Sequence, residues 1–298
     1  MVHIIRLSGL LLYVAAGTPE QRAIDYLAQE VPKWAKENHC YSCHNNGDAA
    51  RALFAAQRHG YAVPNSAIAD TLDWLRQPGH WSETPGTPGV TNITLARIQF
   101  AAALLDARLE NPQPLAAAAQ SLVPLQDRDG SWKVDAGGIP GAPATYGVAL
   151  ATYMARRVVQ AVGLSAPAER ATRWFRTAPA ANVVDAAAIV LAMPQRRDAL
   201  DILHRAQTSD GGWGEPFDTA IAILALHAAG EKELVAMGRK SLLRLQQPAG
   251  GWPETTRPPG GVSYAEHIST TAWALYALLE TAGAPSGETL KPPSRGKW

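Results

Sequence analysis

A seven-residue pattern, Gln-x-x-x-Gly-x-Trp, occurs three times in the chain and constrains its fold more than any other feature. The copies begin at Gln126, Gln207 and Gln246, each at the end of a predicted helix. The second copy follows the first by about two periods and the third follows by one, so a degenerate copy is expected between the first pair. Segment 173–175 falls there, and a shortened copy occupies 77–81. The chain is therefore predicted to be an array of similar units.

Composition favours one compact body rather than several. The chain has 298 residues, of which 47% are hydrophobic and 18% are charged, which is enough to fill a substantial core. The formal net charge of +1 gives no reason to expect nucleic acid as a partner. After the N-terminal segment, no stretch is long and apolar enough for an integral membrane span.

Helical periodicity alternates between two kinds of segment. Amphipathic helices with a charged face are predicted at 19–38, 65–76, 113–126, 166–177, 196–207 and 234–246. Helices that are apolar nearly all round are predicted at 47–60, 91–107, 145–162, 183–194, 217–229 and 267–283. A helix without a polar face has to be buried on all sides. The alternation predicts an all-α fold, a single (α/α)6 toroid with six inner and six outer helices over residues 17–285.

The repeated motif has a structural role in such a ring. Its glycine can adopt the left-handed conformation that ends a helix, and its glutamine amide can bond backbone groups left free at helix ends. Its tryptophan offers a large surface for packing against the next outer helix. Trp132, Trp213 and Trp252 are therefore expected to be buried between neighbouring hairpins.

The three copies resemble the QW motifs of the terpenoid cyclase and protein prenyltransferase superfamily, which includes the squalene-hopene cyclases. The resemblance covers about 19–283 and implies the toroid fold, but the catalytic patterns of that superfamily are not matched. The Asp-x-Asp-Asp acid of squalene-type cyclases is missing, and its nearest imitations begin at Asp70 and Asp127. A prenyltransferase zinc set would need a cysteine near Asp218 and His267, and both cysteines lie far upstream.

One segment carries a recognisable chemistry. Residues 40–44 read Cys-Tyr-Ser-Cys-His, and Cys40 and Cys43 are the only cysteines. Cys-x-x-Cys-His is the attachment sequence of c-type haem, in which two thiols bond the haem vinyl groups and the histidine, here His44, binds the iron. The expected cofactor is therefore covalent haem c. Three alternatives stay open: a Cys40–Cys43 disulfide, a redox dithiol, or half a zinc site with nearby histidines.

The N-terminus supports the haem interpretation. Residues 1–16 have a short basic start, an apolar run and a small-residue end, the layout of a secretory signal peptide cut before Gly17. Haem attachment of this kind follows export, so a periplasmic location is expected. Segments 34–46 and 141–156 also resemble a group of exported bacterial proteins that join a Cys-x-x-Cys-His segment to a squalene-cyclase-like toroid. That group implies no particular activity. Residues 286–298 are expected to form a flexible tail.

Further candidates lie where inner helices begin, at the rim expected to hold the haem. They are Tyr146, Asp218, Tyr264, Glu266 and His267. Aspartates at helix starts, Asp185 and Asp218 among them, also serve simply as caps. A sixth haem ligand would come from the set Met154, His39, His59, His80 and His267, or be absent. Links 77–91, 132–144 and 247–266 are expected to gather at the same rim, with 77–91 and 247–266 covering the haem.

Two classes of function follow. The first is an exported haem protein that transfers electrons or senses a ligand or redox state, with a redox partner protein or a small apolar ligand as partner. The second is an isoprenoid- or lipid-processing enzyme that uses the ring cavity, with the cysteines bridged. A non-catalytic binding scaffold is a further alternative.

Overall fold

The computed structural model of the chain describes residues 17–81, 92–134, 146–255 and 263–282. Residues 1–16 and 283–298, which hold the predicted signal peptide and tail, lie outside these ranges, as do parts of the three long links and part of the cover expected over the haem. Within the described ranges the fold is all-helical, as predicted, and its only β pairing is an isolated bridge between Gln126 and Trp132.

The described residues form twelve α-helices. The odd-numbered helices are α1 (Pro19–Asn38), α3 (Asn65–Leu75), α5 (Gln113–Leu122), α7 (Ser165–Thr177), α9 (Arg197–Ala206) and α11 (Lys232–Arg244). The even-numbered helices are α2 (Ala50–Arg58), α4 (Ile93–Ala107), α6 (Gly147–Ala161), α8 (Val183–Ala192), α10 (Pro216–Ala229) and α12 (Tyr264–Glu280). A π-helical turn, η1 (Cys43–Ala49), runs directly into α2, and short 3₁₀ turns η2 (Pro78–His80) and η3 (Val123–Leu125) follow α3 and α5. The predicted boundaries agree with these to within a few residues.

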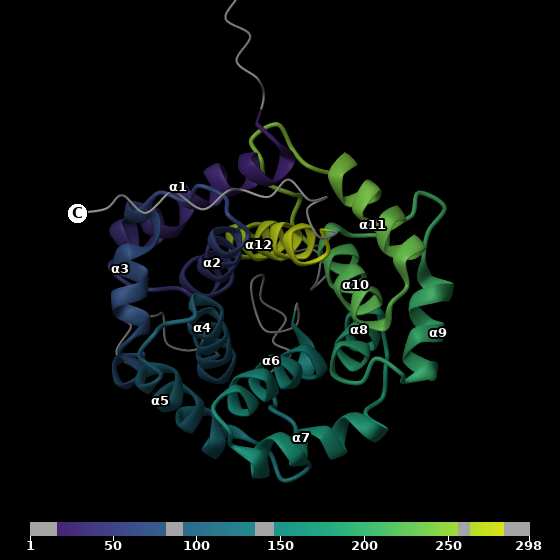
Figure 1. Cartoon of the computed structure of the whole chain (residues 1–298), viewed down its shortest axis with the longest axis horizontal. Helices are drawn as coiled ribbons and strands as arrows, with labels where there is room; N and C mark the ends of the chain where they lie inside the picture. The colour runs from purple at the N-terminus through teal and green to yellow at the C-terminus, as the bar shows by residue number, and fades with distance from the viewer. Residues whose placement is uncertain (1–16, 82–91, 135–145, 256–262, 283–298) are drawn as a thin grey trace, which may run out of the picture.

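Helices of the two kinds occupy different places. Figure 1 shows the even-numbered helices around the centre and the odd-numbered helices at the periphery. Each even-numbered helix contacts the next one, and α12 contacts α2 and η1, so the series closes on itself. Burial follows the sequence pattern, because α10 and α12 are buried on nearly every side, whereas α9 buries only Ala199 and Leu203. In the part of the chain that the structure describes, no helix has the length and apolarity needed to cross a membrane.

Each motif tryptophan joins the outer helix that precedes it to the inner helix that follows it. Trp132, Trp213 and Trp252 are all buried, as predicted. Each indole Nε1 donates a hydrogen bond of 2.7–2.8 Å to a carbonyl of the preceding outer helix. Each tryptophan backbone N–H donates at 3.0 Å to a threonine Oγ1, that of Thr152, Thr219 or Thr271. For Trp132 and Trp252 that threonine lies well inside the following inner helix, and for Trp213 it lies in its first turn.

Two motif glutamines, Gln126 and Gln246, reach the next outer helix, and Gln246 joins the last outer helix to the first. Gln126 Nε2 donates to the carbonyl of Pro167 in the first turn of α7 at 2.9 Å. Gln246 Nε2 donates to the carbonyl of Pro19 in the first turn of α1 at 2.8 Å, and Arg22 donates to Gln246 Oε1 at 2.5 Å. The same motif therefore joins α5 to α7 within the series of outer helices and joins the last outer helix, α11, to the first, α1.

The degenerate copy at 173–175 differs from the three intact copies. Trp174 lies within α7 and is only partly buried, whereas Phe175 beside it is fully buried. The link after α7 is tied instead by Arg196, which precedes the next outer helix. Its guanidinium donates to the carbonyls of Phe175 at 2.6 Å and Ala178 at 3.0 Å. A cation there replaces the glutamine and tryptophan.

Candidate functional site

The Cys-x-x-Cys-His segment spans two local structures rather than one tight turn. Helix α1 ends at Asn38, and His39 after it has a left-handed backbone with φ 51°. Ser42 is extended and caps η1, since its hydroxyl accepts a hydrogen bond from the backbone N–H of Asn45 at 3.1 Å. Cys40 therefore lies in the irregular link, whereas Cys43 and His44 begin the π-helical turn.

Both cysteines are free thiols and both are partly buried. Burial, together with the nearby carboxylate of Asp48, raises the pKa of Cys43 to about 12. This thiol stays protonated at neutral pH, unlike the low-pKa thiols of reactive redox sites. Within the described residues, no group of three or more His, Cys, Asp or Glu side chains is arranged to hold a metal ion.

His44 is enclosed by aromatic rings. Its imidazole meets Trp34 edge-on at a centroid distance of 4.9 Å and Tyr264 at 5.9 Å. Its Nδ1 lies 4.0 Å from Cys43 Sγ, whereas its Nε2 is buried without a hydrogen-bond partner. Burial lowers the pKa of His44 to about 4, so the ring is neutral at physiological pH. A neutral imidazole with a free ring nitrogen is the form that binds a metal.

Tyr264 connects this site to the far end of the chain. Its ring stacks on Trp34 at 5.6 Å with an interplanar angle of 12°. Its hydroxyl donates to Glu30 Oε2 at 2.6 Å and accepts from Asn45 Nδ2 at 2.7 Å. Tyr264 begins α12, so one side chain holds α1, η1 and α12 together around His44.

The donor set fits haem c in its chemistry. Two free thiols, Cys40 and Cys43, lie on either side of the start of η1, and His44 presents a neutral ring whose Nε2 has no hydrogen-bond partner among the described residues. Because that nitrogen is enclosed, a ligand that reaches it has to displace a neighbouring ring. Trp34 Nε1 is likewise buried without a partner, so two ring nitrogens of this cluster are unsatisfied.

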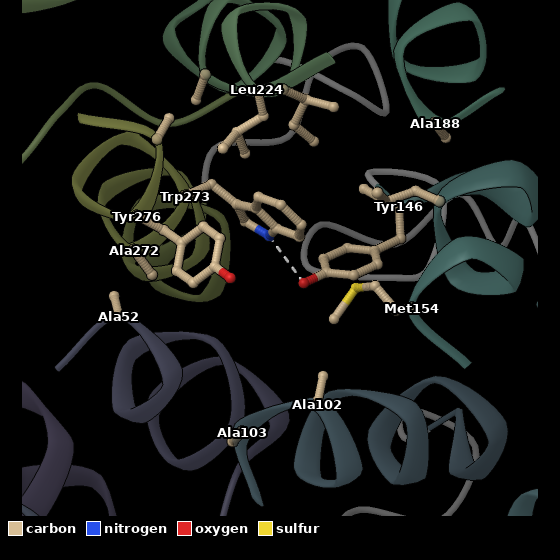
Figure 2. Packing of buried hydrophobic residues seen from close by; sticks show 14 of the residues in the cluster. Ala52, Ala102, Ala103, Tyr146, Met154, Ala188, Leu224, Ala272, Trp273 and Tyr276 are labelled. Carbon is tan, nitrogen blue, oxygen red and sulfur yellow. Dashed lines mark hydrogen bonds between the residues drawn. The ribbon is translucent and has the colours of Figure 1, made fainter. Parts of the chain in front are cut away.

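A second cluster lies at the centre of the ring, around Asp48. Its Oδ2 accepts from Gln99 Nε2 at 2.9 Å and from Ser269 Oγ at 2.8 Å, and its Oδ1 accepts from the Tyr146 hydroxyl. Tyr146 in turn accepts from Trp273 Nε1 at 2.8 Å, as the dashed line in Figure 2 shows. Burial raises the pKa of Asp48 to about 6 despite these donors.

Close approach of two elements makes this cluster possible. A Cβ on Gly47 would lie 2.9 Å from Gln99 Cβ, so only glycine lets η1 approach α4 this closely. Asp48 and Gln99 can then meet in the interior. Helix 47–60 was predicted to be apolar nearly all round, and this is wrong for its first turns, where Asp48 and Arg51 are both buried.

Arg51 occupies the middle of the aromatic side chains. Its guanidinium carbon lies 4.0 Å from the ring centroid of Trp273 and 4.1 Å from that of Tyr276. Its Nη1 is 3.8 Å from Met154 Sδ, and its Nε is 3.5 Å from Asp106 Oδ2. Figure 2 shows Tyr146, Met154, Trp273 and Tyr276 pointing toward one another from α6 and α12. Aromatic faces and a carboxylate both attract a cation and so offset part of the cost of burying this charge.

Two of the predicted pocket residues belong to these clusters, and the others lie in the first turns of inner helices. Tyr146 belongs to the central cluster and Tyr264 to the His44 site. Glu266 is buried and accepts from the Ser263 hydroxyl at 3.1 Å, while its own N–H donates to that hydroxyl at 3.2 Å, so the pair caps α12. Asp218 is buried in the first turn of α10. His267 pairs with Glu254 at 3.2 Å and packs against Tyr26.

The candidate sixth ligands are scattered. Met154 is buried against Arg51, and His59 at the end of α2 lies 3.5 Å from Glu280. His39 is exposed at the end of α1. Asn182 caps α8 by accepting the backbone N–H of Asp185 at 2.9 Å, and Asp185 Oδ2 accepts the backbone N–H of Ala181 at 3.3 Å just before that helix.

Sequence reasoning missed Asp48, Arg51, Gln99 and Asp106. The available signal was a set of charged or amide side chains inside otherwise apolar helices, where an unpaired polar group would be costly. A search with protein-family models gives no match, and a comparison with curated proteins gives none either.

Proposed function

We propose that this chain is an exported protein built on the (α/α)6 toroid of the squalene-cyclase-like superfamily, and that it carries a covalent c-type haem. The closed series of inner helices and the joining role of the QW motifs support the fold. The single observation that carries the haem assignment is His44, whose buried Nε2 has no partner and whose pKa is lowered to about 4.

In this proposal Cys40 and Cys43 hold the haem and His44 is its axial ligand. Haem c supplies one-electron redox chemistry or a site for a small ligand. The protein's part is to supply a neutral His44 from a buried setting beside Trp34 and Tyr264. The function is electron transfer with a redox partner protein in the periplasm, or sensing of a ligand or redox state.

Maturation in a host with the c-type machinery tests this directly. The intact mass should increase by one haem, and the pyridine haemochrome spectrum should show two thioether bonds. Changing Cys40 and Cys43 together to Ala should abolish attachment, and His44→Ala should change the ligation spectrum. His59→Ala is a matched control. This histidine follows α2, at the end farthest from Cys43 and His44, and it pairs with Glu280. A mass without haem and two hydrogens light would indicate a disulfide and contradict the proposal.

The central cluster favours a second candidate, an isoprenoid- or lipid-processing enzyme. Asp48 is a buried acid with a pKa near 6, and Tyr146 and Trp273 extend its hydrogen-bonded network. A carboxyl group with a raised pKa can deliver a proton in a dry site. Linear polyenes incubated with the protein should then give new products that Asp48→Asn abolishes. Equal product from both proteins, or none from either, would exclude this candidate for those substrates.

A further inference from the structure

A groove runs along α11 beside the C-terminal ends of α10 and α12, and its described lining contains no residue of the His44 or central clusters. Its volume is about 820 Å³, within the range of small-molecule sites. The described residues that line it are His227, Lys232, Val235, Ala236, Arg239, Lys240, Leu243, Arg244 and Thr281. The α11 positions among them recur at helical spacing, so one face of this helix forms a long wall.

The lining separates charge from apolar surface. Among the described lining residues, four are Lys or Arg and none is Asp or Glu, although the whole chain has 27 basic and 26 acidic residues. Val235, Ala236, Leu243 and the methylene stems of the cations supply the apolar part. Lysine and arginine side chains commonly cover apolar surface in this way while their charged ends stay in water.

The four basic side chains of the groove differ in whether they already have hydrogen-bond or ion-pair partners. Arg239 donates to the Leu278 carbonyl at 2.6 Å and to Thr281 Oγ1 at 2.8 Å, so it is fixed at the end of α12. Arg244 lies 3.5 Å from Asp210. Lys232 and Lys240 are exposed, and no ion pair engages either of them among the described residues. Two cations along an apolar groove are thus free to meet an anion.

We propose that this groove binds a single-chain anionic amphiphile, a long-chain carboxylate, with its chain along α11 and its acid group at Lys232 or Lys240. From Lys232 to Leu243 the helix rises about 17 Å, which gives an extended chain room to lie flat. Apolar contact supplies the affinity, and the lysines select for an anion over a neutral chain.

Charge also argues against two other occupants. The residues beyond 282 include Lys291, Arg295 and Lys297 against Glu288, so that segment is itself basic. A two-fold contact with a second copy would set the same cationic face against itself. Both arrangements bring like charges together, whereas a carboxylate brings opposite ones.

Calorimetric titration of the full chain with dodecanoate, below its micelle concentration, tests the site. We expect saturable binding near one equivalent, and at least tenfold weaker binding of dodecanol. The double variant Lys232→Glu and Lys240→Glu should lose at least tenfold in dodecanoate affinity. The matched control is Arg176→Glu with Arg205→Glu, which makes the same charge change at exposed positions of α7 and α9 and should bind like the wild type.

Three results would overturn the proposal. The first is equal dodecanoate affinity in the wild type and the Lys232/Lys240 variant, and the second is equal affinity for dodecanoate and dodecanol. The third is a dimer in light scattering that this variant dissociates, which would make the groove an interface between copies. Lys240→Arg keeps the charge and should bind like the wild type, which separates loss of charge from loss of folding. None of these outcomes depends on haem attachment.

Discussion

Gly250→Ala should open the ring at the contact between its last motif and its first helix. Gly250 has φ 100°, and a Cβ there would lie 2.3 Å from the Arg22 carbonyl oxygen and 2.7 Å from its carbonyl carbon. Both are backbone atoms of α1, so they cannot yield as a flexible side chain would. Alanine therefore has to push α1 away from the motif.

The magnitude follows from a matched glycine. Gly230 has a similar φ of 84° but nothing within 4 Å of the added Cβ. Gly230→Ala should therefore cost only the left-handed backbone, about 1–2 kcal/mol, less about 0.4–1 kcal/mol gained from the unfolded chain. Gly250→Ala adds the loss of the Gln246 bonds to Pro19 and Arg22, each about 1–2 kcal/mol, for a total of about 3–5 kcal/mol.

Equilibrium urea unfolding, followed by tryptophan fluorescence and far-UV circular dichroism, measures both variants. The difference between them isolates the contact that closes the ring, since the backbone cost is common to both. If the two free energies of unfolding fall by amounts within about 1 kcal/mol of each other, the seam adds no stability and the reasoning is refuted.

Three further predictions use the same unfolding assay on protein made without haem. Trp213→Ala should cost about 3–5 kcal/mol because it empties a packed aromatic site, and a loss below about 1 kcal/mol would show that the motif does not join the hairpins. Tyr146→Phe should cost about 2–4 kcal/mol, because Asp48 loses a donor and a buried indole N–H loses its acceptor; a neutral effect would contradict the central network. The folded-state pKa of His44 is lowered to about 4, so acidification from pH 7 to 5 protonates this residue in the unfolded state and lowers the free energy of unfolding. The folded-state pKa of Asp48 is raised to about 6, so the same acidification protonates it in the folded state and raises the free energy of unfolding. The Asp48→Asn variant keeps only the His44 effect, so it should become less stable between pH 7 and pH 5. The His44→Gln variant keeps only the Asp48 effect, so it should become more stable over the same interval, and the opposite signs would contradict both shifts.

The helices were predictable because burial alone sets their pattern. Segment 217–229 is apolar at almost every position, and the structure surrounds α10 on all sides. The roles of Trp132 and Gln246 were predictable because the motif repeats with the same geometry. Long, strongly periodic features of this kind are the ones that a single sequence specifies best.

The polar contacts at the centre of the ring could not be predicted from the sequence in the same way. Asp48 and Arg51 are separated by many residues from Gln99, Tyr146 and Trp273, and only ring closure brings them together. Their pairing depends on tertiary geometry that periodicity does not encode. Cys-x-x-Cys-His was easy to find as a motif, but the aromatic enclosure of His44 by Trp34 and Tyr264 was not visible in its spacing.

The closed ring has a consequence for the order in which the chain folds. Helix α12 packs against η1 and α2, so the central core is completed by contacts that span nearly the whole chain. Contacts of such large sequence separation have to overcome loop-closure entropy before they add stability, which slows folding. Until α12 has been synthesised, Asp48 lacks Ser269, Arg51 lacks the rings of Trp273 and Tyr276, and both charges stay in water. A chain that ends before α12 therefore lacks the contacts that complete the core, and Asp48 and Arg51 lack their partners on that helix.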